Sequence, residues 1–160
     1  MSEPAAAIPA GRVAGIDYGR KRVGIAICDA ERIIASPLPL HMPTGDEAAE
    51  TAFFRKLVAA EDVVGFVVGL PVHADGSDSR MSVEVERFGA WLAAATGVPV
   101  TFHDERYSSV EAAGKLAGLG LSRGKKKART DSIAAQILLT AWMEAAAAGT
   151  PATRPGALDG

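Results

Sequence analysis

Three acidic residues of this chain could together build a site for a divalent metal ion. Asp17 and Glu105 each end an apolar segment, and Asp131 opens an apolar helical pattern. Mg²⁺ and Mn²⁺ prefer hard oxygen ligands, and a few carboxylates suffice when phosphate oxygens of a substrate share the ion. One such metal can activate a water molecule while a second stabilises the leaving oxygen. The pattern therefore predicts phosphodiester chemistry, with these three acids as metal ligands and catalytic residues.

Basic residues cluster beside each of the three acids. The chain carries 17 lysines and arginines and a formal net charge of −2, so its total charge does not indicate a nucleic-acid partner. The distribution of the basic residues along the chain does indicate a nucleic-acid partner, because a phosphate backbone is held by local positive charge. A single basic run is usually a solvated loop, but three runs beside three acids favour nucleic-acid binding. The residues concerned are Arg20, Lys21, Arg22, Arg106, Arg123, Lys125, Lys126, Lys127 and Arg129.

Simpler explanations exist for the first two acids. A carboxylate at the end of an apolar strand must be paired, hydrated or bound to metal, and an arginine of the following turn could pair with Asp17. Adjacent residues of a strand face opposite sides, so only one of Asp104 and Glu105 can point into a given site. We favour Glu105 and keep Asp104 as the alternative. His103 would share the side of Glu105 and could assist it.

Asp131 could merely offset the dipole of the helix that it opens, which is worth about 0.3–1 kcal/mol. However, its direction on a helical wheel agrees with that of the apolar residues. The residues within about 60° of it are Ala134, Ala135, Leu138, Trp142 and Ala145. An acid that only offsets the helix dipole does not need to lie on the apolar face of the helix. The position of Asp131 on that face therefore favours a functional role.

The composition of the chain is typical of a globular protein and excludes several kinds of site. The chain has 160 residues, 48% of them apolar and 22% charged, which suits one globular domain. A single cysteine excludes an internal disulfide framework and fits the cytoplasm. The sequence shows no membrane-spanning stretch and no secretory signal. It also lacks a zinc-ligand spacing, a nucleophile elbow and a Walker phosphate loop.

The hydrophobic pattern predicts an α/β domain. We expect a mixed five-stranded sheet, antiparallel in its first three strands and with two parallel additions, flanked by helices. We expect a disordered lead over residues 1–11, a domain over 12–148 and a disordered tail over 149–160. Strands are expected at 12–16, 22–28, 32–40, 63–70 and 98–105, and helices at 47–60, 81–92, 108–118 and 131–148, with a loop carrying the basic run before the last helix.

Four motifs resemble a known family. They are Gly-Ile-Asp-Tyr-Gly-Arg-Lys-Arg-Val-Gly-Ile-Ala at 15–26, Val-Gly-Leu-Pro at 68–71, Asp-Glu-Arg-Tyr-Ser-Ser-Val-Glu-Ala at 104–112, and the basic run that leads into Asp131. In this order they are similar to the YqgF family, also called the Holliday junction resolvase or pre-ribosomal-RNA nuclease family. The resemblance extends from about Arg12 to Met143. One departure is His73, where the family commonly has asparagine.

The resemblance implies an RNase H-like fold and a cytoplasmic, metal-dependent nuclease that matures the 5′ end of pre-16S rRNA in ribosome biogenesis. It implies that Asp17 is the first-strand metal ligand, Glu105 the acid of the Asp-Glu-Arg motif and Asp131 the acid of the last helix. The partner would be a structured RNA precursor, with association to the ribosome, or branched DNA if the chain acts as a junction resolvase.

Two other classes of function remain open from the sequence. One is a nucleic-acid-binding module without catalysis, such as a ribosome-assembly or transcription factor. The other is a nucleotide-binding protein of the actin-like type, although that architecture needs two such domains and this chain is short. The sequence allows a monomer or a homodimer, and a resolvase that makes two symmetric cuts would need the dimer.

Overall fold

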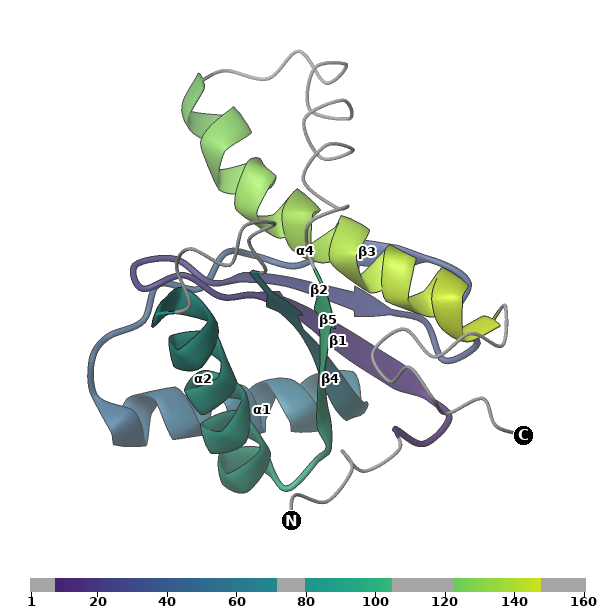
Figure 1. The fold of residues 1–160 in the computed structure, drawn as a ribbon, viewed down its shortest axis with the longest axis horizontal. Helices are drawn as coiled ribbons and strands as arrows, with labels where there is room; N and C mark the ends of the chain where they lie inside the picture. The colour runs from purple at the N-terminus through teal and green to yellow at the C-terminus, as the bar shows by residue number, and fades with distance from the viewer. Residues whose placement is uncertain (1–7, 72–79, 105–122, 148–160) are drawn as a thin grey trace.

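The fold is built on a single mixed sheet with the strand order β3-β2-β1-β4-β5 (Figure 1). The structure is a computed structural model that describes residues 8–71, 80–104 and 123–147. The elements are β1 (Arg12–Asp17), β2 (Gly24–Cys28), β3 (Ala35–Pro37), α1 (Glu47–Glu61), β4 (Val63–Leu70), α2 (Arg80–Thr96), β5 (Val100–Asp104) and α4 (Arg123–Ala147). The mixed five-stranded sheet predicted from the sequence is confirmed.

Strand β1 occupies the centre of the sheet and fixes the direction of the others. It pairs antiparallel with β2 and parallel with β4, while β3 pairs antiparallel with β2 and β5 parallel with β4. Ile16 is aligned with Val68 of β4, which is aligned with Phe102 of β5. The carboxyl ends of β1, β4 and β5 therefore meet at one edge, where open α/β sheets place their ligands.

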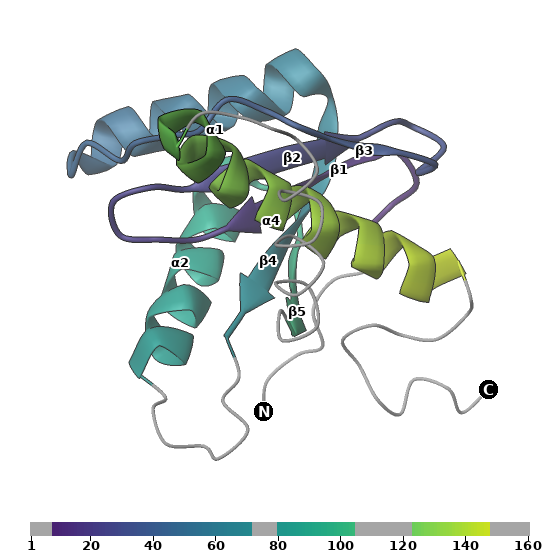
Figure 2. The ribbon, with the colours of Figure 1, turned by 90° about the horizontal axis from the view of Figure 1, so that it is seen from above.

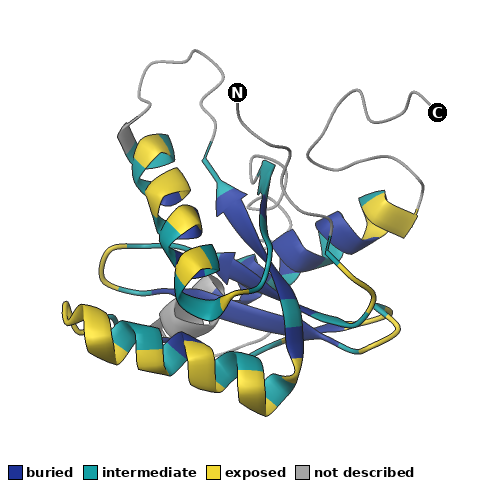
Figure 3. Ribbon diagram, turned by 90° about the horizontal axis from the view of Figure 1, so that it is seen from below, coloured by how far each residue is buried: buried dark blue, intermediate teal, exposed yellow. Residues whose placement is uncertain are grey.

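Helices cover both faces of this sheet (Figure 2). One face packs against α1 and α2, in a core that includes Ile16, Phe54 and Val68. The other face packs against α4, in a second core that includes Val67 and Leu138. Figure 3 shows the sheet buried between these layers and the outer sides of α1 and α2 exposed. Because both faces are covered, β4 is apolar almost throughout, as expected for a central parallel strand.

Helix α4 approaches the sheet closely at Gly15 of β1. A Cβ atom at this position would lie 2.9 Å from Leu139 Cβ and 3.0 Å from the carbonyl oxygen of Ala135. Both α4 residues are fully buried. The absence of a side chain at Gly15 thus lets the helix backbone rest directly on the central strand.

Helix α4 is longer than the sequence pattern suggested. It begins at Arg123, so the expected basic loop is wrong: the basic residues up to Arg129 form its first two turns, and Asp131 lies inside the helix. The physical reason is that lysine, arginine and alanine are good helix formers, and one glycine near the end, Gly124, does not prevent helix formation.

Smaller differences concern the strand ends and the N-terminal lead. The third strand is confined to 35–37, and the fifth ends at Asp104. The expected lead is packed from Ile8 onward, since Ile8 contacts the α4 core and Arg32 donates hydrogen bonds to the carbonyl oxygens of Pro9 and Gly11. Residues 1–7, the expected 108–118 helix and the tail lie outside the described residues. Within the described segments, no helix is long and apolar enough to cross a membrane.

We expect Gly15→Ala to lower the free energy of unfolding by about 1–3 kcal/mol, because the new methyl group must push α4 away from β1. This loss should exceed the gain of about 0.4–1 kcal/mol from restricting the unfolded chain. Urea unfolding followed by circular dichroism would measure it. Ser36→Ala on the exposed side of β3 is the control and should change stability by less than about 0.5 kcal/mol. Equal stability of the two variants would contradict the close approach.

Candidate functional site

Asp17 stands at the carboxyl end of the central strand and is half-buried. Side chains alternate along a strand, and Gly15, two residues earlier, faces α4. Asp17 therefore belongs to the α4 face of the sheet, at the edge where three parallel strands end. This is the position that the sequence predicted for a metal-binding carboxylate.

His103 lies on the same face and at the same level of the sheet. Val100 and Phe102 of β5 pack against the α1/α2 core, so the alternation directs His103 to the α4 side. His103 is aligned with Gly69 of β4, which lies one residue beyond the Ile16–Val68 pair. Asp17, Gly69 and His103 thus form a row across β1, β4 and β5, and the central member has no side chain.

The imidazole of His103 has a buried nitrogen atom and a lowered pKa. Its Nδ1 atom is buried and has no hydrogen-bond partner among the described residues. Burial lowers the pKa of His103, and the nearby Asp104 carboxylate opposes this only in part. The lowered pKa favours the neutral ring, and a buried polar nitrogen with no partner in the described segments is typical of functional sites.

The approach of α4 to this edge can be followed through two hydrogen bonds. Gln136 Nε2 donates to the carbonyl of Ala35 at 2.8 Å, and Ser132 Oγ donates to the carbonyl of Leu38 at 3.0 Å. β3 runs parallel to β1, because both are antiparallel to β2. Helix α4 therefore runs antiparallel to β1, and its N-terminal half comes to the carboxyl end of that strand.

The position of Asp131 along the direction of the strands follows from the same contacts. Leu38 N donates to the carbonyl of Ile25 at 2.8 Å, and Ile25 is the partner of Ile16. Ser132 is thus tied to the strand level that immediately precedes Asp17. The backbone of Asp131 is the next residue of α4 toward that edge, four positions before the buried Ala135.

The three predicted acids are described to different extents. Asp17 is described completely, and Asp131 is described as a backbone position in α4. Glu105 follows the last residue of β5 and lies outside the described residues, as does Arg106. Within the described part of the chain, no three histidine, cysteine, aspartate or glutamate side chains could hold a metal ion. The meeting of the three carboxylates thus stays a prediction.

The basic turn after Asp17 is anchored to α2. Arg20 Nη2 lies 2.7 Å from Glu84 Oε1, and Arg20 Nε donates to the same oxygen at 2.9 Å. The Arg20 side chain nevertheless remains 68% exposed, so the guanidinium is accessible at the surface. Lys21 is exposed and Arg22 half-buried. The sequence did not predict Glu84 as a partner, because it lies 64 positions away in an ordinary helical pattern.

Tyr18 binds the same glutamate, Glu84, as Arg20 does. Its hydroxyl donates to Glu84 Oε2 at 2.7 Å, and its ring centroid lies 4.7 Å from that of Phe88. Burial and the Glu84 carboxylate raise the pKa of Tyr18 to about 12. Tyr18 therefore faces the α1/α2 side of the sheet, whereas the preceding Asp17 faces α4.

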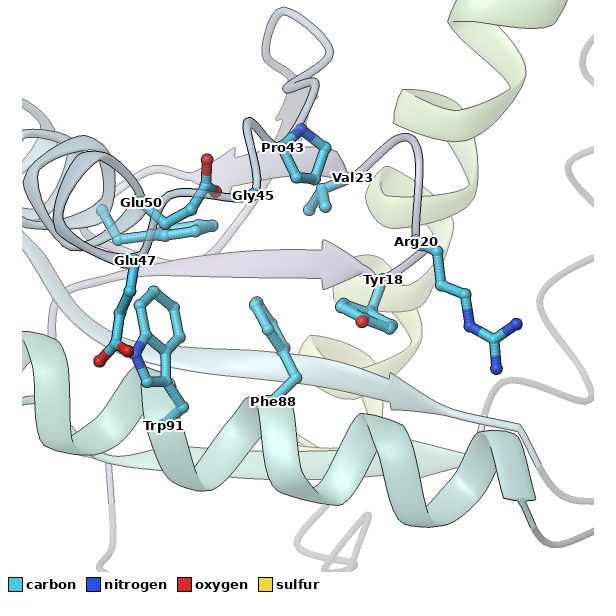
Figure 4. A pocket seen from close by; sticks show the side chains of 11 residues that line it. Tyr18, Arg20, Val23, Pro43, Gly45, Glu47, Glu50, Phe88 and Trp91 are labelled. Carbon is cyan, nitrogen blue, oxygen red and sulfur yellow. The ribbon is translucent and has the colours of Figure 1, made fainter.

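A pocket of about 280 Å³ lies on this α1/α2 side, between the two helices and the basic turn (Figure 4). The sheet separates it from the α4 face that carries Asp17. Its lining residues are Tyr18, Gly19, Arg20, Val23, Pro43, Gly45, Glu47, Glu50, Phe54, Phe88 and Trp91. Sequence patterns did not predict this pocket, because its lining comes from three separate segments that only the fold brings together.

Comparison with known proteins decides the family. Residues 11–145 match the RuvX family model, described as Holliday junction resolvase. The chain belongs to this family. A "Putative pre-16S rRNA nuclease" of Rhodopirellula baltica is 43% identical over 135 residues, which cover 84% of this chain and 78% of that protein. A protein of the same name from Sphingopyxis alaskensis is 39% identical, over 88% of this chain and 92% of its own.

Solved structures agree on the fold. RuvC of T. thermophilus in complex with a Holliday junction substrate superposes with a TM-score of 0.57 at 17% identity, covering 88% of this chain and 97% of that one. A second Thermus thermophilus RuvC structure gives 0.51 at 20% identity, with coverages of 87% and 97%. The RNase H-like fold, the family and the assignment to nucleases, hydrolases of phosphodiester bonds, are confirmed as predicted.

For this RuvX family member we expect the phenol of Tyr18 to lose its proton near pH 12 instead of near its ordinary pKa of 10.0. The folded state holds this proton more tightly than the unfolded chain does. Its stabilising contribution is therefore complete below about pH 10 and is lost as the pH rises through about 12. Glu84→Gln should lower the pKa of Tyr18.

An ultraviolet titration of phenolate absorbance would measure this pKa. Tyr18→Phe is the control, since it leaves Tyr107 as the only tyrosine of the chain. A wild-type titration in which both tyrosines ionise at the ordinary pKa would contradict the buried hydrogen bond to Glu84.

Proposed function

We propose that this chain is a metal-dependent endonuclease that processes the 5′ end of pre-16S rRNA, with Asp17, Glu105 and Asp131 as its catalytic and metal-binding residues. The observation that carries the proposal is the arrangement at one edge of the sheet. There β1 ends at Asp17, β5 ends one residue before Glu105, and α4 arrives from the opposite direction through the hydrogen bond of Ser132.

The chemistry of these residues fits Mg²⁺ or Mn²⁺. Three carboxylates supply hard oxygen donors without a sulfur ligand, and the row formed with Gly69 leaves one position beside Asp17 free of a side chain. When bound, the metal would supply an activated water and would stabilise the leaving oxygen. Asp17 would orient the ion at the edge of the sheet, and His103 would assist by accepting or relaying a proton.

The basic residues would hold the flanking phosphates of the substrate. Arg20, Lys21 and Arg22 belong to the turn that follows Asp17, and Arg106 follows Glu105 directly. The five basic residues from Arg123 to Arg129 precede Asp131 on the same helix. Each acid thus has positive charge next to it in the chain, as substrate binding through the phosphate backbone requires.

We expect Asp17→Asn to reduce cleavage of a pre-16S rRNA substrate by at least about 100-fold, more than is typical for a residue outside the first coordination shell. Cleavage by the wild type should require Mg²⁺ or Mn²⁺ and stop with a chelator. The measurement is a single-turnover assay on labelled RNA, with circular dichroism to verify folding.

Asp62→Asn is a matched control for this charge removal. Asp62 is exposed and ends α1 with a φ of 53°, a conformation that asparagine adopts readily. Its activity should equal that of the wild type. Full activity of Asp17→Asn would refute the proposed site.

Branched DNA is the second candidate substrate, favoured by the description of the family and by the fold shared with RuvC. The same assay should therefore include a four-way junction. Two symmetric cuts in a junction would need two active sites and hence a homodimer. Cleavage of the junction in preference to the RNA, by a dimeric protein, would assign the resolvase function instead.

The alternative function, a nucleic-acid-binding module without catalysis, can be distinguished by measuring binding and cleavage separately. Under the proposed function, replacing Lys125, Lys126 and Lys127 by glutamine should weaken RNA binding and reduce the slope of log affinity against log salt concentration by about 2–3. Filter binding at several salt concentrations would measure the slope. Lys56→Gln, on the exposed side of α1, is the control and should leave the slope unchanged. Wild-type RNA binding without any cleavage in the presence of metal would favour the binding module.

A further inference from the structure

The pocket on the α1/α2 face lies across the sheet from the proposed metal site and shares Arg20 with the proposed phosphate contacts, and it is built like a ligand site. Four aromatic side chains line its walls: Tyr18, Phe54, Phe88 and Trp91. They support one another, with centroid distances of 4.7 Å between Tyr18 and Phe88 and 5.9 Å between Phe88 and Trp91. Most small-molecule sites likewise combine apolar walls with a few convergent polar groups.

The polar groups of this pocket differ at its two ends (Figure 4). Glu47 and Glu50 reach it from the first turn of α1. Arg20 lines the opposite end, beyond Tyr18, where its guanidinium is bound to Glu84 of α2. A ligand that fits these ends carries hydrogen-bond donors at one end and negative charge at the other.

Glu47 is the carboxylate available for a ligand. Glu50 already lies 2.7 Å from His41 Nε2 and accepts hydrogen bonds from Thr44 N and Thr44 Oγ1. Glu47 is exposed at the pocket and makes no hydrogen bond or ion pair with any other residue in the described segments. Figure 4 shows its carboxylate on the side of the pocket that Trp91 lines.

The arginine at the other end is pre-oriented. Glu84 holds its Nε and Nη2 atoms and also accepts the hydroxyl of Tyr18, while most of the Arg20 side chain remains exposed. A guanidinium fixed in this way loses little conformational freedom when it binds an anion such as phosphate.

We propose that this pocket binds a guanine nucleotide, with the base stacked on the aromatic wall, Glu47 on its N1–H and N2–H₂ donors, and Arg20 on the phosphate. A carboxylate accepts two parallel N–H groups, and guanine presents such a pair on one edge. Adenine and cytosine offer there a donor beside an acceptor, which a carboxylate cannot satisfy. Every base stacks on an aromatic side chain, so the selectivity comes from Glu47.

The nucleotide could be free or part of a strand, and the second source rests on the proposed function. Tyr18 follows Asp17 in the chain, and the two residues face opposite sides of the sheet. An RNA strand with a phosphate at Asp17 would pass the 18–22 turn, and a nucleotide near the cut could then enter the pocket. In that case the pocket would select a guanosine next to the cleavage position.

The two tryptophans of the chain allow a direct test. Trp91 lines the pocket, whereas Trp142 is buried against the other face of the sheet. In a Trp142→Phe protein, the fluorescence of Trp91 should be quenched saturably by guanosine 5′-monophosphate. Adenosine 5′-monophosphate should bind at least about 10-fold more weakly. Glu47→Gln in this background should weaken guanosine monophosphate binding at least about 10-fold, and Glu86→Gln, an exposed acid of α2, should not.

A competition experiment distinguishes a free nucleotide from a nucleotide that is part of an RNA strand. Displacement of guanosine monophosphate by a short guanosine-containing oligoribonucleotide assigns the pocket to a strand, and the absence of displacement assigns it to a free nucleotide. Because the assay needs no metal, it should give the same affinity with Asp17→Asn added, so that its outcome is independent of cleavage. Absence of saturable quenching, equal binding by Glu47→Gln, or tighter binding of a lysine-rich peptide would overturn the proposal.

Discussion

The contact between α4 and the central strand sets the geometry of the whole candidate site. At Gly15 the helix backbone lies against β1 with no side chain between them, and Asp17 follows two residues later on the same face. Any increase in this separation would move α4, and Asp131 with it, away from the end of β1. The hydrogen bonds of Ser132 and Gln136 then fix how far the helix slides along the sheet. The proposed catalytic arrangement, which would need sub-ångström precision, is thus positioned by packed backbone, which deforms little.

The turn after β1 joins the two faces of the sheet. Asp17 and Tyr18 are neighbours, and the alternation of the strand directs one to α4 and the other to α2. Glu84 ties this turn to α2 through both Tyr18 and Arg20. The proposed cleavage site and the aromatic pocket are therefore coupled mechanically, because a shift of α2 would displace the residue that follows Asp17. The orphaned nitrogen of His103 stands on the same edge and gives it a polar group without a described partner.

Sequence reasoning succeeded where local pattern and strand geometry decide the outcome. The apolar run of β4 and the acid at the end of β1 could be read directly, because burial on both faces and strand alternation leave a clear signal. The start of α4 was missed, since charged helix formers resemble a solvated loop when only hydrophobic periodicity is considered. The Tyr18–Glu84–Arg20 cluster and the pocket depend on contacts between residues far apart in the chain, which no local pattern contains.

The short strand β3 forms one border of the sheet, and α4 already binds backbone carbonyls there. Gln136 and Ser132 bind the carbonyls of Ala35 and Leu38, and Pro37 has no N–H group to offer. An approaching chain would find fewer free backbone partners along this border. The arrangement that seats α4 thereby also discourages edge-to-edge pairing along β3, the usual hazard of an exposed strand.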